Sequence, residues 1–245
     1  MQQQMHVPKL TKVNKILISV YVGLFILSSL FKSNTGASLL SDLGLSIQGI
    51  EAGHYYQFIT YPFIDHSFMT VLFNALILWF IGSELEVKWG SKFYGKFLAI
   101  ATYSGGVAYA LIFSQFMSGT EMPLYGLTGL NLALFVAYAI IYSERTLVFM
   151  FIFPMKAKYF CMLLAGIELY MSVFSAYSHG ALSHLISMLV GFAFLKIKSL
   201  QARGVTLGAI KEQHHRNKMK QKLKLVKEDE LPPDSPDPDK PKYWQ

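Results

Sequence analysis

Residues 68–81 read FMTVLFNALILWFI and contain no charged side chain, and this stretch decides the fold class. Five other apolar runs share its character; they span residues 16–31, 97–117, 127–142, 159–174 and 182–195. A helix that crosses a bilayer needs roughly 20 mostly apolar residues, within a range of about 17–25. Several of these runs are shorter, but longer neighbours can shield a short helix. The pattern therefore predicts an all-α membrane protein with a bundle of six transmembrane helices.

The basic residues fall on one side of this predicted bundle. They precede the first helix, lie between the second and third and between the fourth and fifth, and follow the sixth: Lys9, Lys12, Lys15, Lys88, Lys92, Lys96, Arg145, Lys156, Lys158, Lys196, Lys198 and Arg203. The intervening loops at residues 33–67, 118–126 and 175–183 contain no Lys or Arg. Because basic loops stay on the cytoplasmic side, we expect both termini in the cytoplasm.

Composition divides the chain into three regions. We expect a basic cytoplasmic arm at residues 1–12, a membrane domain at 13–197 and a cytoplasmic tail at 198–245. The tail is basic at residues 211–227, which suits contact with anionic lipid. It then becomes acidic and rich in proline, a composition that cannot form a packed core, so we expect it to be largely disordered.

Two connecting segments carry apolar residues of their own. The outside loop at residues 33–63 contains leucines that suggest an amphipathic segment on the membrane surface. The stretch at residues 147–153 is too short to span and is interpreted as an extension of the fourth helix or as an interfacial loop.

The sequence predicts no metal, no cofactor and no nucleic-acid partner. No group of His, Cys, Asp or Glu has metal-ligand spacing, and no glycine-rich phosphate loop occurs. His179 lies in the last outside loop, where we expect a surface residue and not a metal ligand.

Polar residues within predicted spans are expensive and are candidates for function. They are Asn74, Thr128, Asn131, Glu168 and His184. Thr128 lies between two glycines where a loop becomes a helix, and the unpaired backbone N–H groups of a helix start can bind an anion. A hydroxyl there, facing a histidine on another helix, has the arrangement of a nucleophile and its base. Each residue also has a structural alternative: the two asparagines can bond between helices, His184 can pack against Thr128, and Glu168 can pair with lysine or line water.

Several motifs, in this order and spacing, resemble the rhomboid intramembrane serine proteases. They cover nearly the whole membrane domain and are YYQFITYPF at 55–63, residues 69–74 at the start of the second helix, GSELE at 82–86 with GS at 90–91, GLTG at 126–129, FPMKAK at 153–158, and His184 followed by Ser187 and Gly191. The resemblance implies a rhomboid-like six-helix bundle. It also implies that small residues let the fourth and sixth helices approach closely.

The resemblance assigns a role to particular positions. Thr128 falls on the nucleophile, His184 on the base and Asn74 on the oxyanion asparagine. The supporting motif positions are Gly126, Gly129, Glu86, Gly90 and Gly191.

The departures from the family pattern cluster on the catalytic parts. The nucleophile serine is Thr128, whose extra methyl group stiffens the side chain. Other family positions are also replaced; here they are Thr70, Leu132, Asp65, Tyr56 and Gln57. A displacement of the reacting oxygen by about 1 Å can reduce the reaction rate on the order of 10²-fold. Loss of an oxyanion donor typically reduces that rate by another ~10²–10³.

The sequence therefore supports two functional hypotheses. In the first, the protein is a pseudoprotease of the plasma membrane, the inner membrane of a bacterium, that binds the transmembrane helices of partner proteins without cutting them. In the alternative, it is an intramembrane endopeptidase with a Thr128/His184 dyad. A small transporter is disfavoured because no repeat and no paired charges through the bilayer are detectable.

Overall fold

The computed structural model describes residues 8–31, 42–116, 123–149, 153–175, 178–202 and 219. The chain forms two units, Met1–Leu195 and Lys196–Gln245, and the fold described below is that of the first. Most of the arm and most of the tail expected from the sequence lie outside the described residues.

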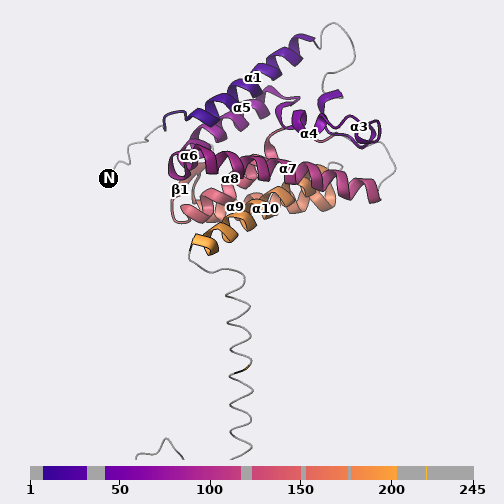
Figure 1. Ribbon diagram of the computed structural model, residues 1–245. Helices are drawn as coiled ribbons and strands as arrows, with labels where there is room; N and C mark the ends of the chain where they lie inside the picture. The colour runs from indigo at the N-terminus through magenta and orange to yellow at the C-terminus, as the bar shows by residue number, and fades with distance from the viewer. Residues whose placement is uncertain are drawn as a thin grey trace, which may run out of the picture. The chain divides into compact units, whose positions relative to one another are not determined.

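Five helices in the described residues are long and apolar enough to cross a membrane. They are α1 (Lys12–Phe31), the continuous segment of α5 (Phe68–Ile77), η2 (Leu78–Gly82) and α6 (Ser83–Trp89), then α7 (Ser91–Phe116), α9 (Ala157–Phe174) and α10 (Ser178–Ala202). The sixth predicted run forms the shorter α8 (Thr128–Ile141). The prediction of an all-α membrane protein is confirmed, and each of the six apolar runs falls on a helix (Figure 1).

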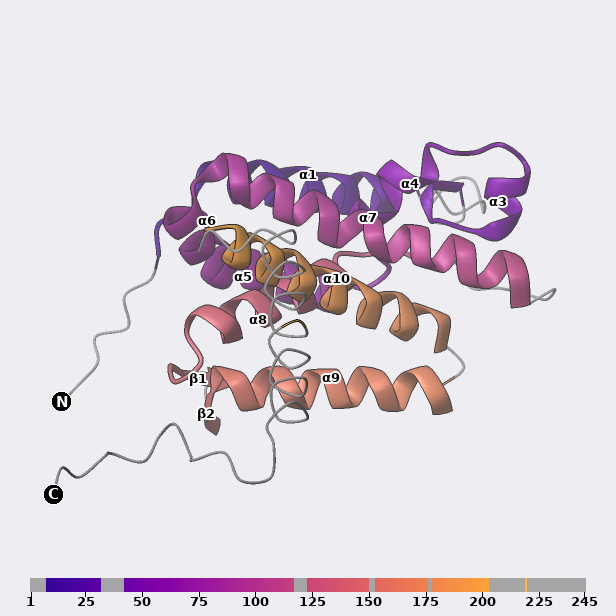
Figure 2. The same ribbon diagram turned by 60° about the horizontal axis from the view of Figure 1, so that its bottom comes forward.

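The short helix α8 lies at the centre of the bundle. It contacts α5, α7 and α9, and in Figure 2 it lies between α5 and α9. Most of its residues are buried, among them Leu130, Ala133, Leu134 and Ala137. Because other helices rather than lipid surround it, α8 does not need the full length of a membrane span. This arrangement explains how a run too short to span still belongs to the core.

The segment after α8 is not an extension of that helix, the first of the two interpretations of its sequence. Residues Thr146–Phe149 form β1 and Phe153–Lys156 form β2, and the two strands pair antiparallel. Thr146 lies opposite Lys156, and Phe149 lies opposite Phe153. The fourth helix therefore ends at Ile141 and is not extended. A strand pair satisfies its backbone hydrogen bonds between neighbouring strands, so the chain returns to α9 without a further helical turn.

The described part of the outside loop packs its apolar residues into the protein, and its position relative to the membrane surface stays a prediction. It contains α3 (Ile47–Glu51), α4 (Gln57–Thr60) and the 3₁₀ helix η1 (Tyr61–Phe63). Leu45 is fully buried and forms a cluster with Ile47, Tyr61, Tyr109 and Leu124. Leu45 also exchanges two backbone hydrogen bonds with Leu124, at 2.9 and 2.8 Å. The apolar residues face the start of α8, because that contact removes them from both lipid headgroups and water.

Candidate functional site

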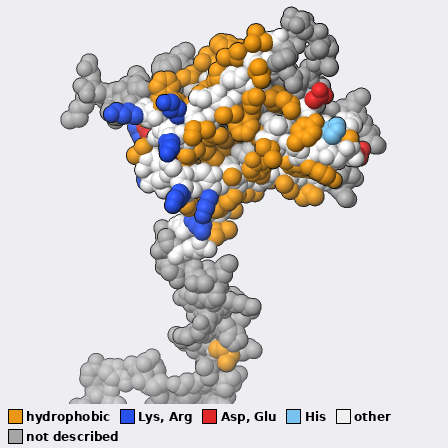
Figure 3. Space-filling view, turned by 45° about the horizontal axis from the view of Figure 1, so that its top comes forward, with side chains coloured by type: hydrophobic (Ala, Val, Ile, Leu, Met, Phe, Trp, Pro, Cys, Tyr) orange, Lys and Arg blue, Asp and Glu red, His pale blue; other side chains and the backbone are white. Residues whose placement is uncertain are grey.

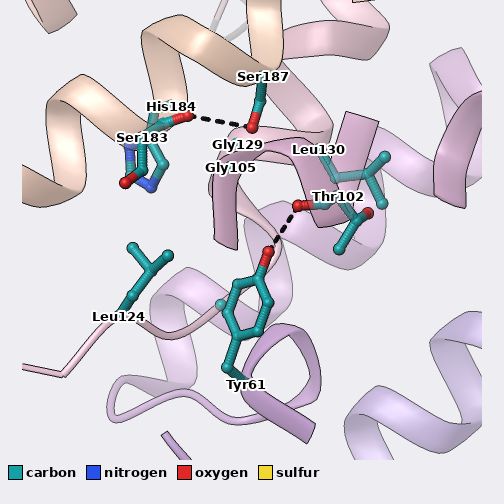
Figure 4. Close-up of a pocket in the computed structure, with 10 residues that line it drawn as sticks. Tyr61, Thr102, Gly105, Leu124, Gly129, Leu130, Ser183, His184 and Ser187 are labelled. Atoms are coloured by element: carbon teal, nitrogen blue, oxygen red, sulfur yellow. Dashed lines mark hydrogen bonds between the residues drawn. The ribbon is translucent and has the colours of Figure 1, made fainter. Parts of the chain in front are cut away.

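A small pocket lies in front of the start of α8, where η1, α7 and α10 meet (Figure 4). The pocket is small and partly open to solvent. Its lining residues are Tyr61, Thr102, Gly105, Leu124, Gly126, Gly129, Leu130, Ser183, His184 and Ser187. The structure thus brings three predicted site residues together: Gly126, Gly129 and His184.

Glycines bring α7, α8 and α10 close together behind this pocket. A Cβ atom added to Gly129 on α8 would lie 3.1 Å from Ser187 Oγ and 3.2 Å from His184 Cδ2 on α10. One added to Gly191 on α10 would lie 3.2 Å from Ala133 Cβ on α8. The predicted close approach of these two helices is therefore confirmed, and it follows the small-residue packing of membrane helices.

Gly105→Ala is expected to destabilise the protein. Its new Cβ would lie 2.4 Å from Ser187 Oγ and 3.2 Å from the Ser183 carbonyl, so α7 and α10 would have to separate. Overpacking of this kind costs about 1–3 kcal/mol. Gly95→Ala on the same helix is the matched control, since nothing lies within 4 Å of its new Cβ. It should gain up to about 1 kcal/mol of helix propensity. Thermal unfolding in detergent measures both variants, and equal unfolding temperatures would contradict the assignment of this contact.

His184 pairs with Glu168, a contact that the sequence did not assign. The Nδ1 atom of His184 on α10 lies 3.2 Å from Oε2 of Glu168 on α9. Both side chains are largely buried, with exposed fractions of 11% and 14%. The expectation that Glu168 pairs with lysine is therefore wrong. A carboxylate beside a histidine nitrogen fixes the orientation of the ring.

Thr128 is the first residue of α8, at the predicted transition from loop to helix. Among the described residues, no hydrogen bond joins Thr128 to His184. The chain reaches Thr128 through Gly126, whose φ of +86° is accessible to glycine at little cost.

Ser183 contributes a second hydroxyl near the pocket. Its Oγ is buried beside the pocket and has no hydrogen-bond partner in the described part of the chain.

Asn74 belongs to a buried chain of hydrogen bonds that links three helices. Its Nδ2 donates to the hydroxyl of Tyr21 on α1 at 2.9 Å, and that hydroxyl donates to Asp65 Oδ2, also at 2.9 Å. Asn131 Nδ2 on α8 donates to Asn74 Oδ1 at 2.8 Å. The amide of Asn74 is thus engaged between helices, and Asn131 bonds between helices as expected. Sequence reasoning missed Tyr21, whose one signal is a hydroxyl within an apolar run.

Three of the five replaced family positions are buried, namely Asp65, Gln57 and Leu132, and the other two are not. Gln57 is buried; its Oε1 accepts from Ser46 N at 3.1 Å, and its Nε2 donates to the Asp42 carbonyl at 3.1 Å. Leu132 is buried against α9 and α10. Thr70 is half-buried and Tyr56 is exposed.

Glu86 and Gly90 lie at the opposite end of the bundle from the pocket. Glu86 accepts from the hydroxyl of Thr11, the backbone N–H groups of Val13 and Asn14, the Asn14 amide and the Ser91 hydroxyl. Gly90 ends α6 with a φ of +78°. These two motif positions join helix ends and are far from the chemistry that the resemblance assigned to Thr128.

His179 differs from its expected place on the surface. It is buried, 7% exposed, with its ring centroid 6.1 Å from that of Tyr109. Within the described residues no group of His, Cys, Asp or Glu is arranged to hold a metal ion.

Comparison with known proteins corrects the family resemblance. Residues 15–215 match the family described as "Eukaryotic integral membrane protein (DUF1751)", and no curated protein matches the chain. The match is to this family and not to the rhomboid proteases, so the identification as a rhomboid protein is not supported. The family is eukaryotic, so the expected bacterial inner membrane is not supported either. Because the match covers most of the chain, the protein belongs to this eukaryotic family of integral membrane proteins.

Proposed function

We propose that this protein binds the transmembrane helices of partner membrane proteins without cutting them, with both of its own termini in the cytoplasm. The observation that carries the proposal is the Glu168–His184 pair, which lies 3.2 Å apart between two membrane helices. Ionisable groups at this depth are costly, and they persist where they serve a ligand or a partner.

The helix α9 that carries Glu168 lies at the edge of the bundle, with most of its surface exposed. Only 11% of the most apolar stretch of this helix is buried inside the protein. It packs on α8 and on the strand pair, and Cys161, Leu164 and Ala165 contact Leu132, Val136 and Met188. The rest of its apolar surface is exposed, including Met171 and Leu169. A partner helix can therefore lie along the exposed surface of α9, next to the polar pair.

The polar groups near α9 indicate which kind of side chain the partner helix should carry. Glu168 offers carboxylate oxygens, and Ser183 Oγ is buried without a hydrogen-bond partner among the described residues. A helix with a polar side chain can satisfy such groups, and interhelical hydrogen bonds in membranes contribute about 0.6–2 kcal/mol. We therefore expect the preferred partner helix to carry a hydrogen-bond donor.

Photocrosslinking in lipid vesicles tests the proposal. A photoreactive amino acid replaces Met171 on α9, and a control replaces Val107 on α7, which is similarly exposed at 47% against 43%. The probes are a polyleucine transmembrane peptide and the same peptide with one central glutamine. The Met171 position should crosslink the glutamine peptide roughly threefold to tenfold more than polyleucine. The Val107 position should not distinguish the two peptides.

The double variant Glu168→Leu/His184→Leu should abolish the preference for the glutamine peptide. If the preference survives in that variant, or if no preference exists, the proposal is wrong. The same peptides are followed by mass spectrometry, and they should remain intact.

One observation favours an alternative function as an endopeptidase. Thr128 begins α8, and the pocket beside it is lined by His184, Gly126 and Gly129. The variants Thr128→Ser, Thr128→Ala and His184→Ala separate the two functions on fluorogenic transmembrane substrates. Cleavage by the natural protein that is lost in Thr128→Ala and in His184→Ala would favour the endopeptidase and contradict the proposal.

A further inference from the structure

Three membrane spans end together at one corner of the first unit. The span of α1 begins at Lys12, the α5–α6 span ends at Trp89 and the α7 span begins at Ser91. Glu86 joins them, because it accepts hydrogen bonds from Thr11 and from Ser91 on either side. Figures 1 and 2 both show the start of α1 beside α6 and the start of α7. Ends of membrane spans lie at the level of the lipid headgroups.

This place, which we call the α1–α6–α7 corner, carries a group of exposed lysines. Its members are Lys9, Lys12, Lys15, Lys88, Lys92 and Lys96, and all are exposed. Within the described part of the chain, none of them has a carboxylate at ion-pair distance. Glu86 is 3% exposed, and its oxygens are occupied by Thr11, Val13, Asn14 and Ser91. Figure 3 shows exposed Lys and Arg side chains beside apolar surface on the face that it draws.

A second basic group on the same chain is neutralised from within. Arg145 pairs with Glu84 at 2.8 Å, and Lys156 and Lys158 both pair with Glu144. Hydrogen bonds from Lys156 and Lys158 lower the pKa of the Glu144 carboxyl to about 2, so Glu144 stays ionised at neutral pH. The two basic groups therefore differ in pairing: the second is held in ion pairs, whereas among the described residues no lysine of the first lies at ion-pair distance from a carboxylate, although Glu86 is buried nearby.

We propose that the α1–α6–α7 corner is a binding site for the headgroups of anionic phospholipids. The phosphate, and in phosphatidylserine the carboxylate, can pair with these lysines, which have no ion-pair partner among the described residues. Each lysine near a charged membrane surface is attracted by an amount that corresponds to roughly fivefold in binding. The corner at Glu144 should bind such lipids far less, because its cations are already paired.

Tryptophan quenching by brominated lipids measures this site directly. Trp89 lies at the corner, and Trp79 donates to the Pro8 carbonyl at 3.0 Å just before α1. The full-length chain with Trp244→Phe leaves these two tryptophans as reporters. It is reconstituted in phosphatidylcholine vesicles that contain brominated phosphatidylserine or, in parallel, brominated phosphatidylcholine. We expect phosphatidylserine to quench at lower mole fraction, with a preference that falls as salt rises.

Charge removal distinguishes the corner from general attraction to the membrane. Lys12→Gln/Lys15→Gln/Lys92→Gln should reduce the preference on the order of fivefold for each lysine engaged. The same positions changed to arginine should keep it, which shows that the bundle tolerates substitution there. Glu144→Gln/Lys156→Gln/Lys158→Gln is the control at the paired group and should leave the preference unchanged.

Each outcome decides the proposal. Equal quenching by the two lipids, or an unchanged preference in the glutamine variant, would overturn it. Loss of the preference in the arginine variant would also overturn it, because the charge would then not be the cause. Displacement of phosphatidylserine by inorganic phosphate at moderate concentration would assign the site to a soluble anion and not to a lipid.

Discussion

Glu86→Ala is expected to lower the stability of the protein by about 3–4 kcal/mol, the largest effect of any substitution proposed for this chain. Five donors from two segments meet this carboxylate: the Thr11 hydroxyl, the Val13 and Asn14 backbone N–H groups, the Asn14 amide and the Ser91 hydroxyl. The two backbone donors belong to the first turn of α1, so the glutamate acts as a helix cap supplied by another helix. Its loss leaves several buried donors without an acceptor.

The single cysteine provides the measurement. Cys161 on α9 is only partly exposed, and a thiol-reactive dye labels it as the protein unfolds during heating in detergent. Glu86→Gln should fall between the natural protein and Glu86→Ala, because the amide keeps one acceptor oxygen. Glu51→Ala removes an exposed glutamate on α3 and should change little. An unfolding temperature for Glu86→Ala equal to that of Glu51→Ala would show that the carboxylate is not a structural hub.

Tyr21→Phe is expected to cost about 2–4 kcal/mol, although it removes only one oxygen atom. That oxygen accepts from Asn74 and donates to Asp65, and all three side chains are buried. The variant leaves a carboxylate oxygen and an amide unpaired where water cannot replace the hydroxyl. Tyr103→Phe on α7 is the control, since Tyr103 is 40% exposed.

A double-mutant cycle shows whether this cost comes from the hydrogen-bond chain. Tyr21→Phe and Asn74→Ala, measured singly and together with the same dye, should be non-additive by about 1–2 kcal/mol because they remove the same bond. Additive effects would mean that Tyr21 contributes through packing alone, and the chain from Asp65 to Asn131 would then lose its role in joining α1 to the core.

The motif positions that suggested a protease each have a structural explanation in this fold. Gly129 and Gly191 let α8 and α10 touch, and Gly90 ends α6 with a positive φ. Glu86 holds three helix ends together. Any membrane bundle with close helix crossings needs small residues and capped ends at such places. Motifs of this kind therefore indicate a scaffold more reliably than they indicate chemistry.

The sequence by itself determined the membrane character and the positions of the helices. Apolar runs and basic clusters suffice for this, because the bilayer selects for length and hydrophobicity residue by residue. The sequence also predicted that a loop becomes a helix at Thr128, where α8 begins.

Only the tertiary structure decided which polar groups meet. The partners of Glu168, Asn74 and Glu86 come from other helices, far away in sequence for Asn74 and Glu86. The rotation of each helix about its axis selects these partners, and packing of the whole bundle sets that rotation. Periodicity cannot supply it for helices that are apolar on every side. The tertiary structure also explains why α8 can be short: its neighbours shield it from lipid.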